Sequence, residues 1–225
     1  MSKEIEKILA NVRTEQALRV AQERLRQYAD LLKPWADKQA EDMVRRVYEA
    51  NERLWGRHAK RMGFDLKRYV TEGDLASIIE KMKWEASGYI RSLSNKAAES
   101  AAELAQDAMM YGLRPEAIEK EVLSLGKITE NRARLIARTE VARANTILIQ
   151  ARAESIGSEA YIWQTAEDGR VRESHIEMNG KVVYWNNPPE LDGFVAHAGS
   201  MPNCRCIPLP LLDGDELEEA IARKR

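Results

Sequence analysis

The residue composition of this 225-residue chain changes at Gly157, and this change limits the fold more than any other feature. From Glu4 to about Glu121 the chain is rich in Ala, Leu, Glu, Lys and Arg, with apolar residues at helical spacing. After Gly157 the apolar residues fall in short aromatic and β-branched segments, which favour strands. The sequence therefore predicts an α+β protein, with a mainly helical N-terminal region followed by a small α+β module whose short sheet packs on a long helix.

Several helix limits are predicted in the first part of the chain. Pro34 is expected to end or kink the first helix. A helix is expected from Asp74 to Met110, with a break near Gly88 or Ser94. The next helix is expected to open at Thr129 and to run to about Ser155. Three tryptophans of the helical region are interpreted as buried anchors, because aromatic side chains fill cores: Trp35, Trp55 and Trp84.

The last third of the chain predicts two strands and a short helix. The strands are residues 160–165 and 181–185, and residues 172–178 form the helix between them. Residues 186–202, rich in proline and glycine, are expected to form a loop that leads into residues 204–208. The domain limits predicted from these patterns are 1–125 for the helical region, 126–212 for the module and 213–225 for a charged tail.

Net charge and cysteine content limit the classes of function. The net charge is −1, so no overall basic field attracts nucleic acid. The chain shows no apolar run long enough to cross a membrane and no secretory signal at its N-terminus, and its two cysteines stand two positions apart. We therefore expect a cytoplasmic protein without a disulfide framework.

Both cysteines and one histidine of the last third form a candidate metal site. Cys204 and Cys206 point to the same face if residues 204–206 are extended. With His175 they would supply three ligands for Zn²⁺, and the fourth would come from His197, Asp168 or water. The alternative is a pair of free thiols packed as small apolar groups, with His175 hydrogen-bonded to a carboxylate.

A polar cluster is also expected around the long helix. Arg138 and Asn145 share a helix face with Leu135 and Ile149, so Arg138 is expected to be buried and paired with a carboxylate. The members of the expected cluster are Arg138, Asn145, Asp168, Arg172, His175, Asn203 and Arg205.

An ordered set of short motifs carries a family resemblance. The motifs are Arg138-Thr139-Glu140, Trp163, the segment from Asp168 to His175, Asn179-Gly180, and Pro202-Asn203-Cys204-Arg205-Cys206. In these residues the chain resembles the phage Mu F-like head-morphogenesis family, the minor head proteins of tailed phages and prophages. The resemblance covers roughly residues 60–212 and is sharpest over 129–208. The sequence is shorter than many such proteins, so the activities housed in the long extra domains of some relatives are not expected in it.

The resemblance implies a low-copy component of the procapsid. Such a protein is recruited near the portal during assembly, with portal, capsid or scaffold proteins as partners. It would be found in the host cytoplasm during assembly and then in the procapsid or virion interior. The helical region is expected to dock on these partners, because its apolar residues exceed what a kinked hairpin can hide.

The second class of function is an enzyme. Arg138 would hold a phosphate and Glu140 or His175 would act as a base, in a hydrolase or in a group transfer like that of ADP-ribosyltransferases, which the Arg-Thr-Glu string resembles. No nucleotide-binding glycine loop or zinc-protease helix is present. Assembly is the favoured interpretation.

The DNA backbone is a further expected partner, contacted through phosphates without reading of bases. The arginines that would form the basic surface are Arg132, Arg134, Arg138, Arg143, Arg152, Arg170, Arg172 and Arg205. Acidic neighbours such as Glu130, Glu140 and Glu154 dilute this charge.

Overall fold

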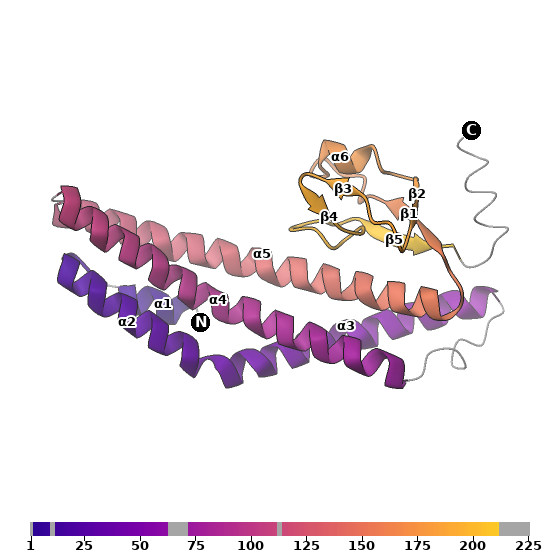
Figure 1. The fold of residues 1–225 in the computed structure, drawn as a ribbon, viewed down its shortest axis with the longest axis horizontal. Coiled ribbons are helices and arrows are strands. Elements are labelled where there is room, and N and C mark those ends of the chain that lie inside the picture. Colours follow the sequence, from indigo (N-terminus) through magenta and orange to yellow (C-terminus); the bar gives the residue numbers. More distant parts are fainter. Residues whose placement is uncertain (1, 10–11, 63–71, 112–113, 212–225) are drawn as a thin grey trace. The chain divides into compact units, whose positions relative to one another are not determined.

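The protein is described by a computed structural model over residues 2–9, 12–62, 72–111 and 114–211 (Figure 1). Its helices are α1 (Ser2–Leu9), α2 (Glu15–Leu31), α3 (Lys33–Met62), α4 (Glu72–Tyr111), α5 (Pro115–Ser155) and α6 (Glu173–Ile176). Its strands are β1 (Ala160–Gln164), β2 (Val182–Tyr184), β3 (Glu190–Leu191), β4 (Phe194–Val195) and β5 (Ile207–Pro210). The predicted α+β class is confirmed.

Two of the expected helix limits are wrong. Helix α4 continues through Gly88 and Ser94, because a glycine costs only about 1 kcal/mol in a helix that has a buried face. Helix α5 does not open at Thr129 but at Pro115. The Thr129 hydroxyl donates to the carbonyl of Leu125 at 2.8 Å, as a threonine does inside a helix.

The chain divides into two compact units. The first comprises Met1–Glu41 and Lys83–Ala137, and the second comprises Asp42–Met82 and Arg138–Arg225. The limit expected at residue 125 falls inside α5, and the units divide this helix after Ala137 instead. Part of the N-terminal helical region therefore belongs to the same unit as the C-terminal strands.

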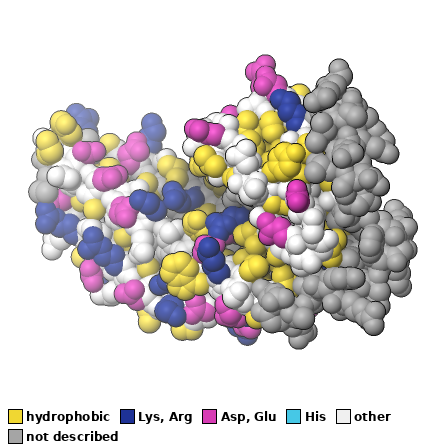
Figure 2. Space-filling model, turned by 45° about the vertical axis from the view of Figure 1, so that its right-hand side comes forward, with side chains coloured by type: hydrophobic (Ala, Val, Ile, Leu, Met, Phe, Trp, Pro, Cys, Tyr) yellow, Lys and Arg dark blue, Asp and Glu magenta, His cyan; other side chains and the backbone are white. Residues whose placement is uncertain are grey.

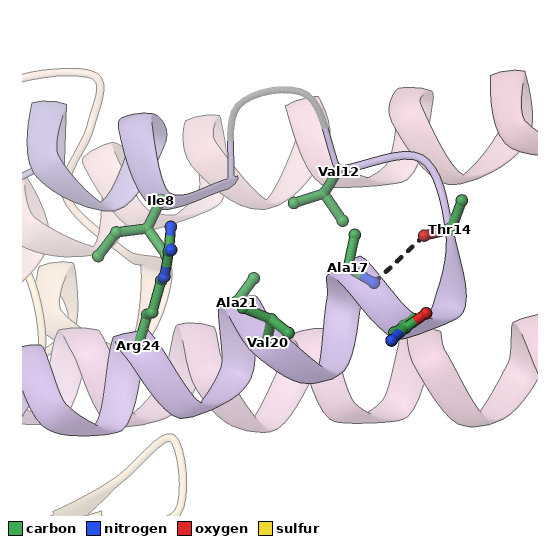
Figure 3. A pocket seen from close by; sticks show the side chains of 8 residues that line it. Ile8, Val12, Thr14, Ala17, Val20, Ala21 and Arg24 are labelled. Carbon is green, nitrogen blue, oxygen red and sulfur yellow. Dashed lines mark hydrogen bonds between the residues drawn. The ribbon is translucent and has the colours of Figure 1, made fainter.

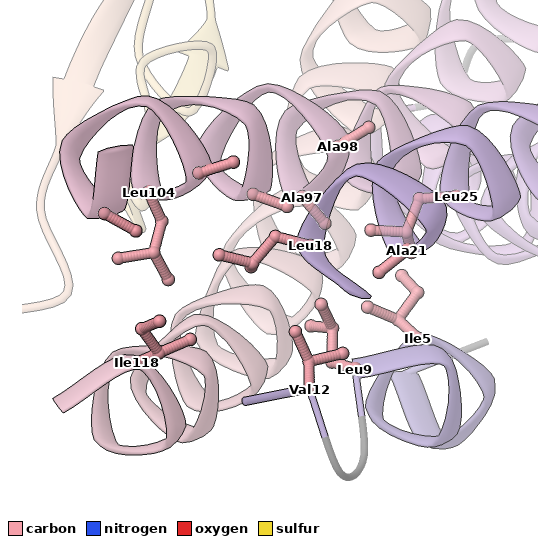
Figure 4. Packing of buried hydrophobic residues seen from close by; sticks show 13 residues of the cluster. Ile5, Leu9, Val12, Leu18, Ala21, Leu25, Ala97, Ala98, Leu104 and Ile118 are labelled. Carbon is pink, nitrogen blue, oxygen red and sulfur yellow. The ribbon is translucent and has the colours of Figure 1, made fainter. Parts of the chain in front are cut away.

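The first unit is a helical assembly with an aliphatic core. Leu18 and Leu25 of α2 pack with Ala97 and Ala101 of α4, and Ile118 of α5 joins the same cluster (Figure 4). Small alanines on α4 let the helices approach closely, so burial of the larger aliphatic side chains stabilises the unit.

A groove of about 390 Å³ lies in the first unit beside α1 and α2 (Figure 3). Ile8, Val12 and Val20 line it, and Arg24 lines it beside Ile8. At the start of α2 the Thr14 hydroxyl caps the helix by accepting a hydrogen bond from the N–H of Ala17 at 3.2 Å.

The second unit carries a three-stranded antiparallel sheet in the order β2-β1-β5. Ile162 of β1 lies opposite Val182 of β2 on one side and Leu209 of β5 on the other. A separate hairpin, β3 with β4, lies within the segment expected to be a loop, so this part of the prediction is wrong. The Asp192-Gly193 turn permits the hairpin, because both residues have a positive φ.

The sheet packs on helices through an aromatic core. Trp163 and Trp185 pack with Trp55 of α3 and Ala153 of α5. Trp55 is thus buried as expected, but Trp35 and Trp84 are 43% and 76% exposed, so the prediction is wrong for those two side chains. Helical spacing alone does not say which face of a long helix is covered.

No helix in the described ranges is long and apolar enough to cross a membrane. On the face shown in Figure 2, positive and negative side chains are mixed among apolar ones.

Candidate metal centre

Two chain segments bring His175, Cys204 and Cys206 together in the second unit. The short helix α6 carries His175, which is 2% exposed. The two cysteines precede β5 and are both buried free thiols. Asn203 has φ of 59°, and this turn lets the N–H of Cys206 point at the Cys204 sulfur at 3.4 Å.

The nitrogen–sulfur distances of the group match those of a tetrahedral site. His175 Nδ1 lies 3.5 Å from Cys204 Sγ and 3.4 Å from Cys206 Sγ. All three donor atoms lie within 4.8 Å of one another. Zinc bond lengths of roughly 2.3 Å to sulfur and 2.0 Å to nitrogen place tetrahedral ligands about 3.6 Å apart, close to the observed distances. The group is therefore able to hold a metal ion.

The other ring nitrogen of His175 faces a carboxylate. Nε2 lies 3.7 Å from Asp192 Oδ2, and it has no closer hydrogen-bond partner among the described side chains. Asp192 is held in turn by the Ser174 hydroxyl, which donates at 2.8 Å. The imidazole also meets the Trp163 ring edge-on at 5.5 Å. A metal-binding histidine commonly directs its second nitrogen to a carboxylate in this manner.

A hydrogen bond between the two thiols shifts their pKa values in opposite directions. The Cys206 thiol donates to the Cys204 sulfur, and backbone N–H groups of Cys206 and Gly199 also point at it, which lowers the pKa of Cys204 to about 5. The same hydrogen bond and burial raise the pKa of Cys206. Hydrogen bonds thus already stabilise a thiolate, the form that binds metals, at Cys204.

Neither protein candidate for the fourth ligand lies with the three donors. His197 Nδ1 is 3.3 Å from the Tyr161 hydroxyl, and the ring packs against Trp185. Burial lowers the pKa of His197. Asp168 forms a two-point ion pair with the Arg205 guanidinium, which lowers the pKa of this carboxyl.

The expected polar cluster forms separate local contacts. Asp168 binds Arg205 as just described, and Arg172 donates to the carbonyl of Pro202 at 2.8 Å. The N–H of Asn203 donates to the Thr139 hydroxyl at 3.0 Å. Asn145 accepts a hydrogen bond from Asn51 of α3 at 2.9 Å. No local sequence pattern predicts the partners Thr139 and Asn51. The dipeptide Asp192-Gly193, however, is a turn signal that would have placed Asp192 at a hairpin tip.

Arg138 is exposed, so the expectation that it is buried against a carboxylate is wrong. Glu140, two positions later on α5, is the buried member of the motif at 8% exposure. Burial raises the pKa of Glu140 to about 7, with Arg143 Nη1 3.9 Å from its carboxylate. No hydrogen bond or ion pair within the described part of the chain joins Arg138, Glu140 and His175, and the enzymatic alternative stays a prediction.

Fold and site together define a class: a small α+β module, packed on long helices, with a buried histidine and two cysteines grouped at its centre. Residues 100–208 match the family described as Phage Mu protein F like protein. The resemblance inferred from the motifs is therefore confirmed, and this segment is phage Mu F-like.

One curated relative extends beyond this segment. A protein of Haemophilus influenzae, described only as uncharacterized, is 34% identical over 157 residues. These residues are 68% of this chain and 34% of that protein, so the chain spans about a third of the length of its relative. No solved structure matches the chain significantly.

Proposed function

We propose that this protein is a minor head protein that acts in procapsid assembly near the portal of a phage or prophage. The observation that carries the proposal is the phage Mu F-like match over residues 100–208, which includes β1, β2 and the start of β5. The protein acts in the host cytoplasm during assembly and stays in the procapsid or virion interior.

Exposed apolar side chains of the first unit support protein partners. Leu31 is 78% exposed and Trp84 is 76% exposed. Large apolar side chains in water cost free energy that a protein contact recovers. We propose that portal, capsid or scaffold proteins bind this helical region.

Contact with DNA is a secondary proposal that the charges support only weakly. Arg134 is paired with Glu130 at 2.6 Å, and Arg170 and Arg205 both contact Asp168. Arg152 is buried, with its guanidinium 5.3 Å from the Tyr48 ring. Paired arginines release fewer counterions on binding phosphates, so we expect a shallow dependence of DNA affinity on salt.

Complementation tests the assembly role. A phage or prophage that lacks the gene is supplied with wild-type protein or with Leu31→Ser/Trp84→Ser, and the protein content of purified heads is measured. We expect wild type in the heads and the double variant depleted, although it remains folded by circular dichroism. Glu103→Ala, an exposed change on α4, is the matched control. Normal head yield without the protein would contradict the role in assembly.

The metal in the His175, Cys204 and Cys206 group is proposed to be zinc. Two thiolates and an imidazole at tetrahedral spacing suit this ion, and it would join α6 to the segment before β5. A chelator should lower the melting temperature of wild type by about 5 °C or more and leave Cys204→Ser/Cys206→Ser unchanged. Equal responses of the two proteins would contradict the zinc assignment.

A further inference from the structure

A cavity of about 60 Å³ adjoins the candidate zinc site. His175, Cys204 and Cys206 all line it, together with Arg170, Arg172 and Arg205. Since roughly 10–15 Å³ of such space is enough to hold one water molecule, the cavity has room for a ligand of a few heavy atoms. Space is thus available beside all three donor residues.

The described part of the chain supplies no fourth donor. The group of candidate ligands contains His175, Cys204 and Cys206 and no further imidazole, thiol or carboxylate from the described residues. His197 and Asp168 are engaged with Tyr161 and Arg205 respectively. A tetrahedral ion held by three protein groups keeps one position that a ligand from solution fills.

The charges around the cavity favour an anion in that position. Three of the residues that line the cavity are arginines, and none of the lining residues is acidic. Their carboxylate partners Asp168 and Asp192 are not among the lining residues. The bound ion would offset the charge of the two thiolates, so the arginines leave the cavity positive.

We infer that the zinc site has an exchangeable fourth position which binds a small anion from solution in the arginine-lined cavity. The inference rests on the proposed zinc site. It separates this centre from a closed structural zinc site, in which four protein ligands exclude outside ligands.

Cobalt substitution tests this inference, because the visible absorption of Co²⁺ reports its ligands. The full-length chain is loaded with one equivalent of Co²⁺ and titrated with sodium azide, a linear anion small enough for the cavity. We expect thiolate-to-cobalt absorption on loading and a saturable change of the cobalt bands with azide. Arg170→Gln should raise the azide dissociation constant about threefold, as for the loss of a surface charge contact. Lys181→Gln, an exposed change that does not line the cavity, should leave it unchanged.

The possible results separate the two proposals. Cobalt bands that do not respond to azide would show a closed site and overturn the inference, while the metal site itself would stand. If His197→Gln or Asp168→Asn changes the cobalt bands in the absence of azide, a side chain of the protein supplies the fourth ligand. This result would also overturn the inference of an exchangeable position. Failure of wild type to bind Co²⁺ or Zn²⁺ would remove the metal site and the inference together.

Discussion

The hydroxyl of Thr146 donates a hydrogen bond to the carbonyl of Ala198 at 2.7 Å, across 52 positions of the sequence. Gly199 follows directly, and a Cβ there would lie 2.6 Å from Thr146 Oγ1 and 2.9 Å from the Cys206 carbonyl. The segment that leads to the cysteines therefore lies against α5 without space for a side chain at Gly199.

The first prediction is that Gly199→Ala destabilises the protein more than Gly193→Ala. Both glycines have positive φ, 84° and 77°, so each alanine variant carries a backbone cost of about 1 kcal/mol. Only at Gly199 does the new methyl group also clash, which adds about 1–3 kcal/mol. Urea unfolding of the two variants measures the difference. Equal midpoints would contradict the close approach at Gly199.

The second prediction concerns the hydrogen bond itself. Thr146→Val keeps the shape of the side chain but leaves the Ala198 carbonyl without its donor, and should cost about 1–3 kcal/mol. Thr129→Val is the matched control on the same helix, because the Leu125 carbonyl that Thr129 contacts also accepts a helical N–H. The free energy of unfolding should be nearly unchanged in this control. A Thr146→Val variant as stable as wild type would show that the contact contributes nothing.

Local sequence signals predicted the candidate metal donors and two of the three strands of the sheet. The strands β1 and β2 lie within the predicted ranges, because alternation and turn residues mark them locally. The spacing of Cys204 and Cys206 indicated a shared site, and both sulfurs do meet His175. The strands depend on residues that are close in sequence. The candidate donors are cysteine and histidine, which are rare in this chain and therefore easy to identify.

Contacts over long distances in the sequence were not predictable in the same way. The burial of Trp55 against Trp163 and the bond from Asn51 to Asn145 depend on how α3 and α5 pack, which no local pattern encodes. Arg138 was assigned to the buried face, whereas Glu140 is the buried residue. The spacing of apolar residues on a long helix is compatible with more than one buried face, so it did not decide between them.

The third prediction is a dependence of stability on pH caused by Glu140. Burial raises its pKa from 4.5 to about 7, so the native state binds the proton more tightly than the unfolded state does. This contribution to stability is full below about pH 4.5 and is lost as the pH rises through about 7. Glu140→Gln removes the effect and should be more stable than wild type at pH 8, by up to about 3 kcal/mol.

Urea unfolding of wild type and Glu140→Gln at several pH values between about 5 and 8 tests the Glu140 prediction, because the stability difference should change across this range. Glu121→Gln, which changes an exposed residue on the same helix, is the control and should follow the wild-type profile. Parallel profiles for Glu140→Gln and wild type would contradict a raised pKa at Glu140.

The fourth prediction is that Asp192 orients His175 for metal binding. Asp192→Asn should weaken zinc affinity about 10–100-fold, because the carboxylate no longer fixes the ring through Nε2. Glu190→Gln, an exposed change on the same hairpin, should leave the affinity unchanged. Competition with a chromophoric chelator measures both constants. If Asp192→Asn bound zinc as tightly as wild type, Asp192 would have no role in orienting His175.

The metal content of the native chain tests the central claim most directly. Native mass spectrometry of protein purified without chelator should show about one zinc ion per chain, as a structural or partly open zinc site requires. His175→Ala and Cys206→Ser should each lose the ion, while His197→Gln should retain it, because only the first two residues supply donors. Wild-type protein that stays free of zinc when one equivalent is supplied, with both thiols reduced, would contradict the account and leave Cys204 and Cys206 as packed thiols.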